Sequence, residues 1–447
     1  MKSPSSKIFP AMLDTGAAQR LAGWTTIPAF NRMRRKLGSR IRNGQSPASN
    51  LAQLQTSFDP ADTLRSLRAH RWSIYDAQYL LLIILGIFSM SVIEEPGALV
   101  KTSLATLLML SLILPITRQF FLPFLPALTW LVLFYACRFI PSEWRPHIWV
   151  RVLPALENII YGANISNIIS AHKHPILDVL AWLPYGVLHF IGPIILSATV
   201  FVFGAPGSLR VYARSFGYLN IIGVLIQLCF PCSPPWYENM YGMAPADYSM
   251  HGEPAGLARI DELFGLNMYT STFNASPIVF GAMPSLHAGW ATMQACFLSH
   301  LFPRARWAFF TYVLWVWWST LYLQHHYAVD LIGGSILAGT IFYVAKVKFL
   351  ARLQPDKTLR WDYDYVEVGS GSNETYHYAM HDMSGDYSSE DEWTIGSSSG
   401  ISSGCRSPVS PVDDVHSLWS SSASDTIAAT SEVDPEDYFV PGNDDRV

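Results

Sequence analysis

The sequence predicts an all-α protein: a polytopic membrane helix bundle of about eight transmembrane helices with disordered polar tails. Half of its 447 residues are hydrophobic and only 14% are charged. The mean hydropathy is positive, +0.21, although both ends of the chain are polar and lower the average. Apolar runs with short polar breaks fill the region from Tyr79 to Phe349, and such runs are typical of helices that cross a bilayer. Nothing in this composition indicates nucleic-acid binding.

The N-terminal segment 1–77 is polar and basic, with a basic cluster from Arg32 to Arg42. No continuous apolar core follows a basic start in the first 30 residues, so we expect no signal peptide. A basic cluster of this kind acts as a topology signal, as a solvated tail or as a grip on acidic lipid headgroups. The first two interpretations are favoured, and 1–77 is predicted to be a cytosolic segment.

The membrane domain is predicted over 78–349. Several of its apolar runs are shorter than the roughly 20 residues that span a bilayer. The helix count is therefore less firmly specified than the pattern of alternating hairpins. The helices are expected at 78–93, 100–116, 120–140, 177–203, 216–231, 286–302, 307–324 and 329–347.

Basic residues beside alternate helix ends orient the predicted bundle. With eight helices they all fall on one side of the membrane, which the positive-inside rule makes cytosolic together with both termini. The loop 232–284 falls on the opposite, lumenal side, and its charged residues are acidic apart from Arg259. Sequons at Asn164 and Asn274 lie on that same side. The basic residues are Arg65, Arg68, Arg71, Arg118, Arg210, Arg214, Arg304, Arg306, Lys346, Lys348 and Arg352.

The C-terminal segment 350–447 differs sharply in composition from the membrane domain. It is rich in Ser, Asp, Glu and Gly and poor in aliphatic residues. Such a segment buries too little apolar surface to offset the entropy of ordering it. It is predicted to be an acidic, Ser-rich, disordered cytosolic tail.

Three ionisable residues at the mouths of two predicted helices indicate chemistry. His326 and Asp330 precede or open the last helix, and their spacing of four places them on one face. A carboxylate there can hold one imidazole nitrogen and leave the other free as a nucleophile or base. His287 opens the helix at 286–302 on the same membrane side. A helix-start Asp beside interfacial histidines is the alternative for the first pair alone.

Two arginines and a serine extend this cluster. Arg138 lies at the end of the helix at 120–140 and Arg145 just after it, both predicted on the lumenal side. Guanidinium groups match the oxygens of a phosphate group, although an arginine at a helix end can also snorkel to the membrane interface. Ser285 stands at a helix start, where exposed N–H groups favour anions. The convergence of these groups on one face predicts a phosphate-binding site.

Small residues predict how the two histidine-bearing helices meet. The last predicted helix contains the small residues Gly334, Ala338 and Gly339. The helix at 286–302 contains Gly289 and Ala295. Small residues four apart permit close approach of membrane helices, although ordinary membrane-helix composition explains them nearly as well. We expect these two helices to pack together and to bring His287 to His326.

Taken together, the motifs resemble the three-part signature of the type 2 phosphatidic acid phosphatase superfamily. The matching residues are Arg138-x6-Arg145-Pro146, Pro284-Ser285-Leu286-His287 and Ser319-x6-His326-x3-Asp330. Three positions depart from that signature: Arg138 replaces a lysine, Leu286 a glycine and Thr320 an arginine. The segments 232–237, 256–261, 281–287 and 325–331 more specifically resemble the fungal inositol phosphorylceramide synthases, a resemblance that covers most of residues 70–350.

The resemblance implies a Golgi-membrane transferase with a lumenal site. It would move phosphoinositol from phosphatidylinositol to the primary hydroxyl of ceramide or phytoceramide and release diacylglycerol. A small regulatory membrane subunit is the implied protein partner. Cofactors are not implied, and no metal is expected, since no carboxylate cluster of metal-binding spacing stands beside the histidines. The pair Cys229-x2-Cys232 has redox spacing but no second pair, which disfavours zinc or redox chemistry.

The roles implied by the resemblance fall on named residues. His326 would be the nucleophile that forms a phosphohistidine, and Asp330 would orient it. His287 would be the general acid and then the general base. Arg138, Arg145 and Ser285 would hold phosphoryl oxygens, with Ser319 a weaker match and His325 an interfacial neighbour.

Two other functions fit parts of the pattern. A lipid phosphate phosphatase would use the same histidines with water as acceptor, but Thr320 and the long insert at 232–284 speak against it. A membrane scaffold or transporter would distribute polar groups along its helices, whereas here they gather at helix ends on one face.

Overall fold

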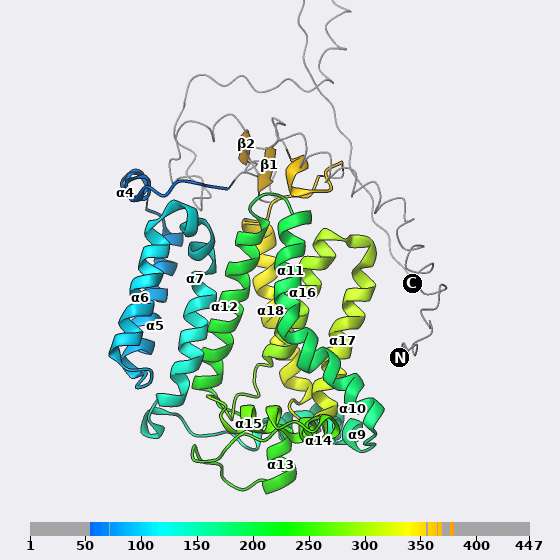
Figure 1. The fold of residues 1–447 in the computed structure, drawn as a ribbon. Helices are drawn as coiled ribbons and strands as arrows, with labels where there is room; N and C mark the ends of the chain where they lie inside the picture. Colours follow the sequence, from blue (N-terminus) through cyan, green and yellow to red (C-terminus); the bar gives the residue numbers. More distant parts are fainter. Residues whose placement is uncertain (1–53, 71, 355, 364, 369–375, 380–447) are drawn as a thin grey trace, which may run out of the picture. The chain divides into compact units, whose positions relative to one another are not determined.

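The computed structural model describes residues 54–70, 72–354, 356–363, 365–368 and 376–379 (Figure 1). Predictions for the basic cluster and for the distal acidic tail lie outside these residues. The described part is mostly helical, which confirms the all-α polytopic fold, with one short hairpin of strands as an addition.

The long apolar helices lie where the sequence predicted them. The largest shift is in α12, which begins at Ser208 instead of 216 and so includes Arg210 and Arg214. Arg214 is buried and donates to the Tyr79 hydroxyl at 3.0 Å, so the helix tolerates it. The bounds are α5 (Ala77–Val92), α6 (Ala98–Ile113), α7 (Pro115–Ala136), α10 (Pro175–Trp182) continued through a π-helical segment (Leu183–Leu188) into α11 (His189–Phe203), α12 (Ser208–Cys229), α16 (Leu286–Leu301), α17 (Arg306–Tyr322) and α18 (Ala328–Lys348).

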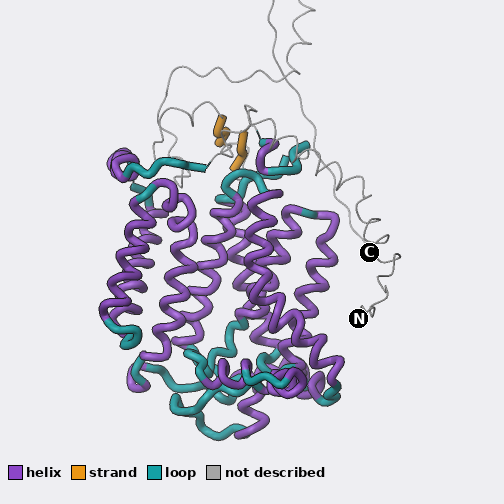
Figure 2. The backbone as a smooth tube through the Cα atoms, viewed as in Figure 1, coloured by secondary structure: helices purple, strands orange, loops and turns teal. Residues whose placement is uncertain are grey.

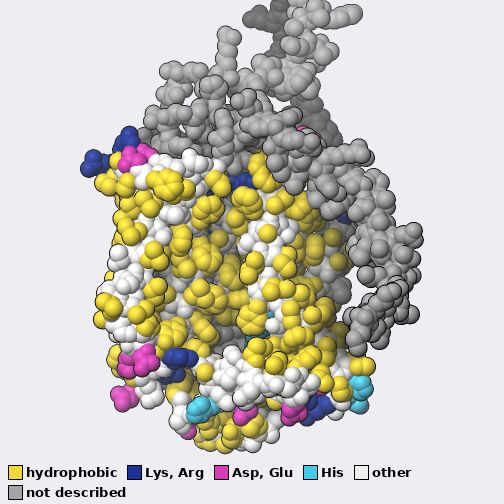
Figure 3. Space-filling model, viewed as in Figure 1, with side chains coloured by type: hydrophobic (Ala, Val, Ile, Leu, Met, Phe, Trp, Pro, Cys, Tyr) yellow, Lys and Arg dark blue, Asp and Glu magenta, His cyan; other side chains and the backbone are white. Residues whose placement is uncertain are grey.

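Five of these segments are long and apolar enough to cross a membrane. The helices α6, α16 and α17 have 16, 16 and 17 residues, which at 1.5 Å per residue is shorter than a bilayer core of about 30 Å. On the face drawn in Figure 3, hydrophobic side chains cover the helix sides and charged ones gather towards the two ends. The chain is therefore a multi-pass membrane protein, and the count of eight spans stays a prediction.

Short helices and loops gather at the end of the bundle that carries the histidines (Figures 1 and 2). They form a packed layer, with Trp236, Tyr237 and Phe280 buried against Ile148 and Val150. Bridges between Trp149 and Cys232, and between Cys232 and Gly281, tie this layer to the chain before α16. The helices of the layer are α8 (Val152–Tyr161), α9 (Ile165–Ser170), α13 (Pro235–Tyr241), α14 (Ala258–Phe264) and α15 (Met268–Asn274).

At the opposite end lie α4 (Pro60–Ala69) and an antiparallel hairpin of β1 (Tyr365–Val368) and β2 (Tyr376–Ala379). Tyr363 and Ala351 are buried against Ala205 of the membrane domain, and Arg360 lies over the ring of Phe201. The expected disorder therefore does not begin at residue 350. The average composition of residues 350–447 is polar and does not reveal the aromatic residues between 361 and 363. These residues supply enough apolar surface to pack.

The helices α16 and α18 cross in close contact, as the small residues predicted. A Cβ at Gly334 would overlap the Ser285 carbonyl oxygen, and a Cβ at Gly289 would lie 3.4 Å from the Gly334 carbonyl oxygen. The Thr292 hydroxyl donates to the Ser335 hydroxyl across the same interface at 2.9 Å. Glycine is therefore required at 334 by close backbone approach.

We predict that Gly334→Ala destabilises the protein by about 1–3 kcal/mol, because the added methyl group must push the two helices apart. The matched control is Gly339→Ala on the same helix, where a Cβ would meet nothing within 4 Å. The measurement is thermal unfolding of both variants in detergent. Equal midpoints for the two variants would contradict the prediction.

Candidate active site

The structure brings together the three residues predicted to be catalytic. His326 lies in the turn before α18, Asp330 in the first turn of α18 and His287 in the first turn of α16. The Nδ1 atom of His326 is 3.3 Å from Oδ2 of Asp330, and its Nε2 atom is 3.1 Å from Nδ1 of His287. His326 and Asp330 are buried, at 6% and 0% exposure. One imidazole thus faces a carboxylate with one nitrogen and a second imidazole with the other.

Buried carboxylates fix the start of α18. Glu157 of α8 accepts from the backbone N–H of Ala328 at 2.8 Å and from that of Ile165 at 3.1 Å. Asp330 accepts from the N–H of Tyr327, whose hydroxyl donates to Glu238. Burial raises the pKa of Glu157, and its backbone donors oppose that rise. These bonds satisfy N–H groups that a helix start leaves without partners.

Glu157 was not among the predicted site residues. Its only sequence signal is a single carboxylate inside the apolar run from Leu153 to Tyr161, a placement that is costly unless the group is paired.

Ser285 is the N-cap of α16. Its side chain accepts from the Ala288 N–H at 3.3 Å, and its own N–H donates to the Asp330 carbonyl at 3.0 Å. It is fully buried. Ser285 therefore positions His287 relative to Asp330, and a direct contact with phosphate stays a prediction.

Arg138 and Arg145 donate hydrogen bonds to backbone carbonyls, and their contact with phosphate stays a prediction. Arg145 donates to the carbonyls of Ile140 and Cys137, just beyond the last turn of α7, and Arg138 donates to that of Ala275. Both line a pocket of about 200 Å³ whose lining includes Gln227 but none of the three catalytic candidates. The guanidinium of Arg145 acts as a helix-end cap, which the motif spacing alone could not reveal.

The hydroxyls of Ser319 and Thr320 are bonded within their own helix. They donate to the carbonyls of Trp315 and Trp317 within α17, and both residues are fully buried. Hydroxyl groups in membrane helices commonly bond back to their own turn. The weak match at Ser319 therefore has no counterpart in the geometry.

His325 is buried, so the expectation of an interfacial side chain is wrong. Its exposure is 6%, its Nε2 lies 3.1 Å from the Pro254 carbonyl, and its ring lies between those of Tyr185 and Phe273. Burial, together with the neighbouring His326, lowers the pKa of His325 to about 3. His325 is therefore neutral near neutral pH, with the Nε2 proton donated to Pro254.

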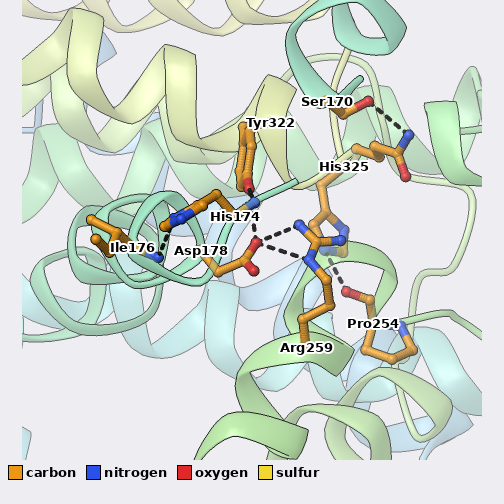
Figure 4. Close-up of polar contacts among 9 residues, drawn as sticks. Ser170, His174, Ile176, Asp178, Pro254, Arg259, Tyr322 and His325 are labelled. Atoms are coloured by element: carbon orange, nitrogen blue, oxygen red, sulfur yellow. Dashed lines mark hydrogen bonds and ion pairs between the residues drawn. The ribbon is translucent and has the colours of Figure 1, made fainter. Parts of the chain in front are cut away.

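A partly buried ion pair between Arg259 and Asp178 lies beside His325 (Figure 4). Oδ1 of Asp178 accepts from Nε and Nη2 of Arg259 at 2.8 and 2.6 Å and from the Tyr322 hydroxyl at 3.0 Å. This network joins α10, α14 and α17. Arg259, which stood out as the lone basic residue in an acidic loop, is therefore held by a partner from outside that loop.

Two further rings flank His287, and the sequence analysis did not identify them. Tyr185 stacks on His287 at a centroid distance of 4.3 Å, and His189 lies 4.4 Å away. Within the residues that the structure describes, no group of three or more His, Cys, Asp and Glu side chains is arranged to hold a metal ion. The mechanism expected without metal stays a prediction.

Comparison with known proteins agrees with this geometry. The PAP2 superfamily profile matches residues 148–344. The inositol phosphorylceramide synthase catalytic subunit aur1 of Schizosaccharomyces pombe is 55% identical over 72% of this chain and 76% of its own length. This chain belongs to the inositol phosphorylceramide synthase family. The Candida albicans inositol phosphorylceramide synthase and the Saccharomyces cerevisiae catalytic subunit AUR1 are each 45% identical over 72% of this chain, covering 69% and 80% of their lengths.

These matches confirm the resemblance to the inositol phosphorylceramide synthases that the sequence motifs indicated. The roles of single residues still rest on geometry. The profile match begins at residue 148, after Arg138 and Arg145, and includes His287, His326 and Asp330. The part of the chain that the profile covers is thus the part in which the structure assembles the histidines.

Proposed function

We propose that this chain is an inositol phosphorylceramide synthase, which transfers phosphoinositol from phosphatidylinositol to the primary hydroxyl of ceramide or phytoceramide and releases diacylglycerol. The observation that carries the proposal is the contact of His326 with both Asp330 and His287. Family membership favours this transfer over hydrolysis by a lipid phosphate phosphatase, because the relatives that match 72% of this chain are named as synthases.

In the first step, Nε2 of His326 attacks phosphorus and the bond from phosphorus to the diacylglycerol oxygen breaks. Protonated His287 gives its proton to that oxygen, so diacylglycerol leaves as a neutral alcohol. The product on the enzyme is a phosphohistidine that carries inositol. The phosphoryl group must enter between the two imidazoles, so their 3.1 Å contact opens when substrate binds.

In the second step, His287 takes the proton of the ceramide hydroxyl and the hydroxyl oxygen attacks phosphorus. The bond from phosphorus to Nε2 breaks, and both histidines return to their starting states. Oδ2 of Asp330 lies 3.3 Å from Nδ1 of His326. A carboxylate at that nitrogen favours the tautomer with Nε2 free and stabilises the positive charge of the intermediate.

The decisive measurement uses membranes that carry this chain and phosphatidylinositol labelled in its inositol. With ceramide, label should move to inositol phosphorylceramide; without ceramide, little soluble labelled inositol phosphate should form. Equal release of label with and without ceramide would indicate that water is the acceptor and would favour the hydrolytic alternative.

Variants should separate nucleophile from general acid. His326→Ala should abolish transfer and the exchange of diacylglycerol, because no covalent intermediate can form. Asp330→Asn should lower kcat strongly, up to about 10⁴-fold by analogy with a triad aspartate. His287→Ala should lose transfer but recover enzyme labelling with a phosphoinositol donor whose leaving group is a nitrophenol, since such a group needs little protonation.

Trapping the labelled enzyme without acid makes this test direct, because phosphohistidine is acid-labile. The matched control is His172→Ala, since His172 is exposed on the chain between α9 and α10. Label trapped on the His326→Ala protein would show that the nucleophile is another residue.

The proposed setting is the Golgi membrane, with the histidine end of the bundle lumenal, both termini cytosolic and a small regulatory membrane subunit as partner. The distribution of basic residues along the chain supports this orientation. A cysteine introduced at the exposed Tyr241 of α13 should react with an impermeant reagent only from the lumenal side of sealed vesicles. Labelling from the cytosolic side would overturn the orientation.

A further inference from the structure

Six rings lie in one continuous series through the candidate active site, with His287 among them. Successive ring centroids are 4.1, 4.4, 4.3, 5.3 and 4.7 Å apart. The three elements α16, the segment 183–189 and the turn before α18 contribute five of the rings, and α15 contributes the sixth. In order, the rings are Trp290, His189, His287, Tyr185, His325 and Phe273.

The π-helical segment Leu183–Leu188 places Tyr185 and His189 on either side of His287. A π turn holds one more residue than an α turn and changes which side chains share a face, and such turns are frequent at functional sites. The register is fixed by contact, because a Cβ at Gly186 would overlap the Tyr269 hydroxyl and the Trp182 ring. The Trp182 indole N–H also donates to that hydroxyl.

The ring plane of His287 needs such support once substrate binds. The torsion that rotates an imidazole about its bond to Cβ is broad, so the rotamer alone does not fix the plane. Among the described residues, the His287 ring has a hydrogen bond to the His326 ring. The entering phosphoryl group must break that bond. The contacts with the rings of Tyr185 and His189 then restrain the plane of the His287 ring.

We propose that Tyr185 is a positioning residue for His287, with His189 supporting the opposite face. Tyr185 stacks on His287 with an interplanar angle of 18°, and the Tyr185 side chain is buried at 4% exposure. It acts through the flat face of its ring, which holds the His287 nitrogen in line with the leaving oxygen. This proposal rests on the proposed function for the acid and base role of His287.

The test compares Tyr185→Leu, which removes the ring, with Tyr185→Phe, which keeps it. Tyr185→Leu should lower kcat for transfer from phosphatidylinositol about 10- to 100-fold, the usual loss when a reacting group is displaced by about 1 Å. The KM for phosphatidylinositol should change less than about threefold, and Tyr185→Phe should stay close to wild type. With the nitrophenol donor, the Tyr185→Leu loss should shrink to a few-fold, because protonation of the leaving group matters less.

The matched control is Tyr212→Leu, a buried tyrosine of α12 whose ring lies against Phe297 away from the site. It should reduce stability without changing the ratio of rates between the two donors. An equal loss with both donors for Tyr185→Leu, or a loss in Tyr185→Phe as large as in Tyr185→Leu, would overturn the proposal.

A structure of the Tyr185→Leu variant tests the same point without any activity. The His287 ring should be rotated from its wild-type plane, and an unchanged plane would overturn the positioning role. If the wild-type chain transferred phosphoinositol from neither donor, the proposed function would fail, while the plane of His287 in the variant would still decide the positioning role.

Discussion

The close crossing of α16 and α18 is the contact on which the rest of the site depends. Without a side chain at Gly334, the backbone of α18 lies against the Ser285 carbonyl, and the Ser285 N–H bonds to the Asp330 carbonyl at 3.0 Å. These contacts set the two helix starts side by side. His287 follows the cap of α16 and His326 directly precedes the cap of α18, so the crossing also sets Nδ1 of His287 3.1 Å from Nε2 of His326.

Burying the two helix starts removes their free N–H groups from water. Acceptors that include one from the layer of short helices offset this cost. The first N–H groups of α18 are buried away from water, and an unpaired buried donor costs about 1–3 kcal/mol. Glu157 supplies an acceptor from α8 and Asp330 another from the same turn. Helix α8 and the loop 232–284, neither of which was predicted as a membrane helix, thus complete the active-site end of the membrane domain.

Sequence reasoning recovered the helices, the histidines and Asp330 because each has a local signal: long apolar runs, a spacing of four, and small residues at the crossing. The phosphate-binding role of Arg138 and Arg145 stays a prediction, since spacing does not tell whether a guanidinium faces a ligand or a helix end. Tyr185 and Glu157 were missed for a related reason. The π turn and the bond between α8 and α18 arise from tertiary packing, which no short pattern encodes.

The position of the arginines bears on the kind of phosphate that this site can accept. Arg138 and Arg145 bond to backbone carbonyls, and Thr320 stands where the superfamily signature has an arginine, its hydroxyl bonded within α17. A phosphomonoester carries a charge of about −1.5 to −2 near neutral pH. A phosphodiester such as phosphatidylinositol has one ionisable proton fewer and carries a charge of about −1. A threonine in place of that arginine therefore costs a diester donor less than a monoester, because the diester has less charge to balance.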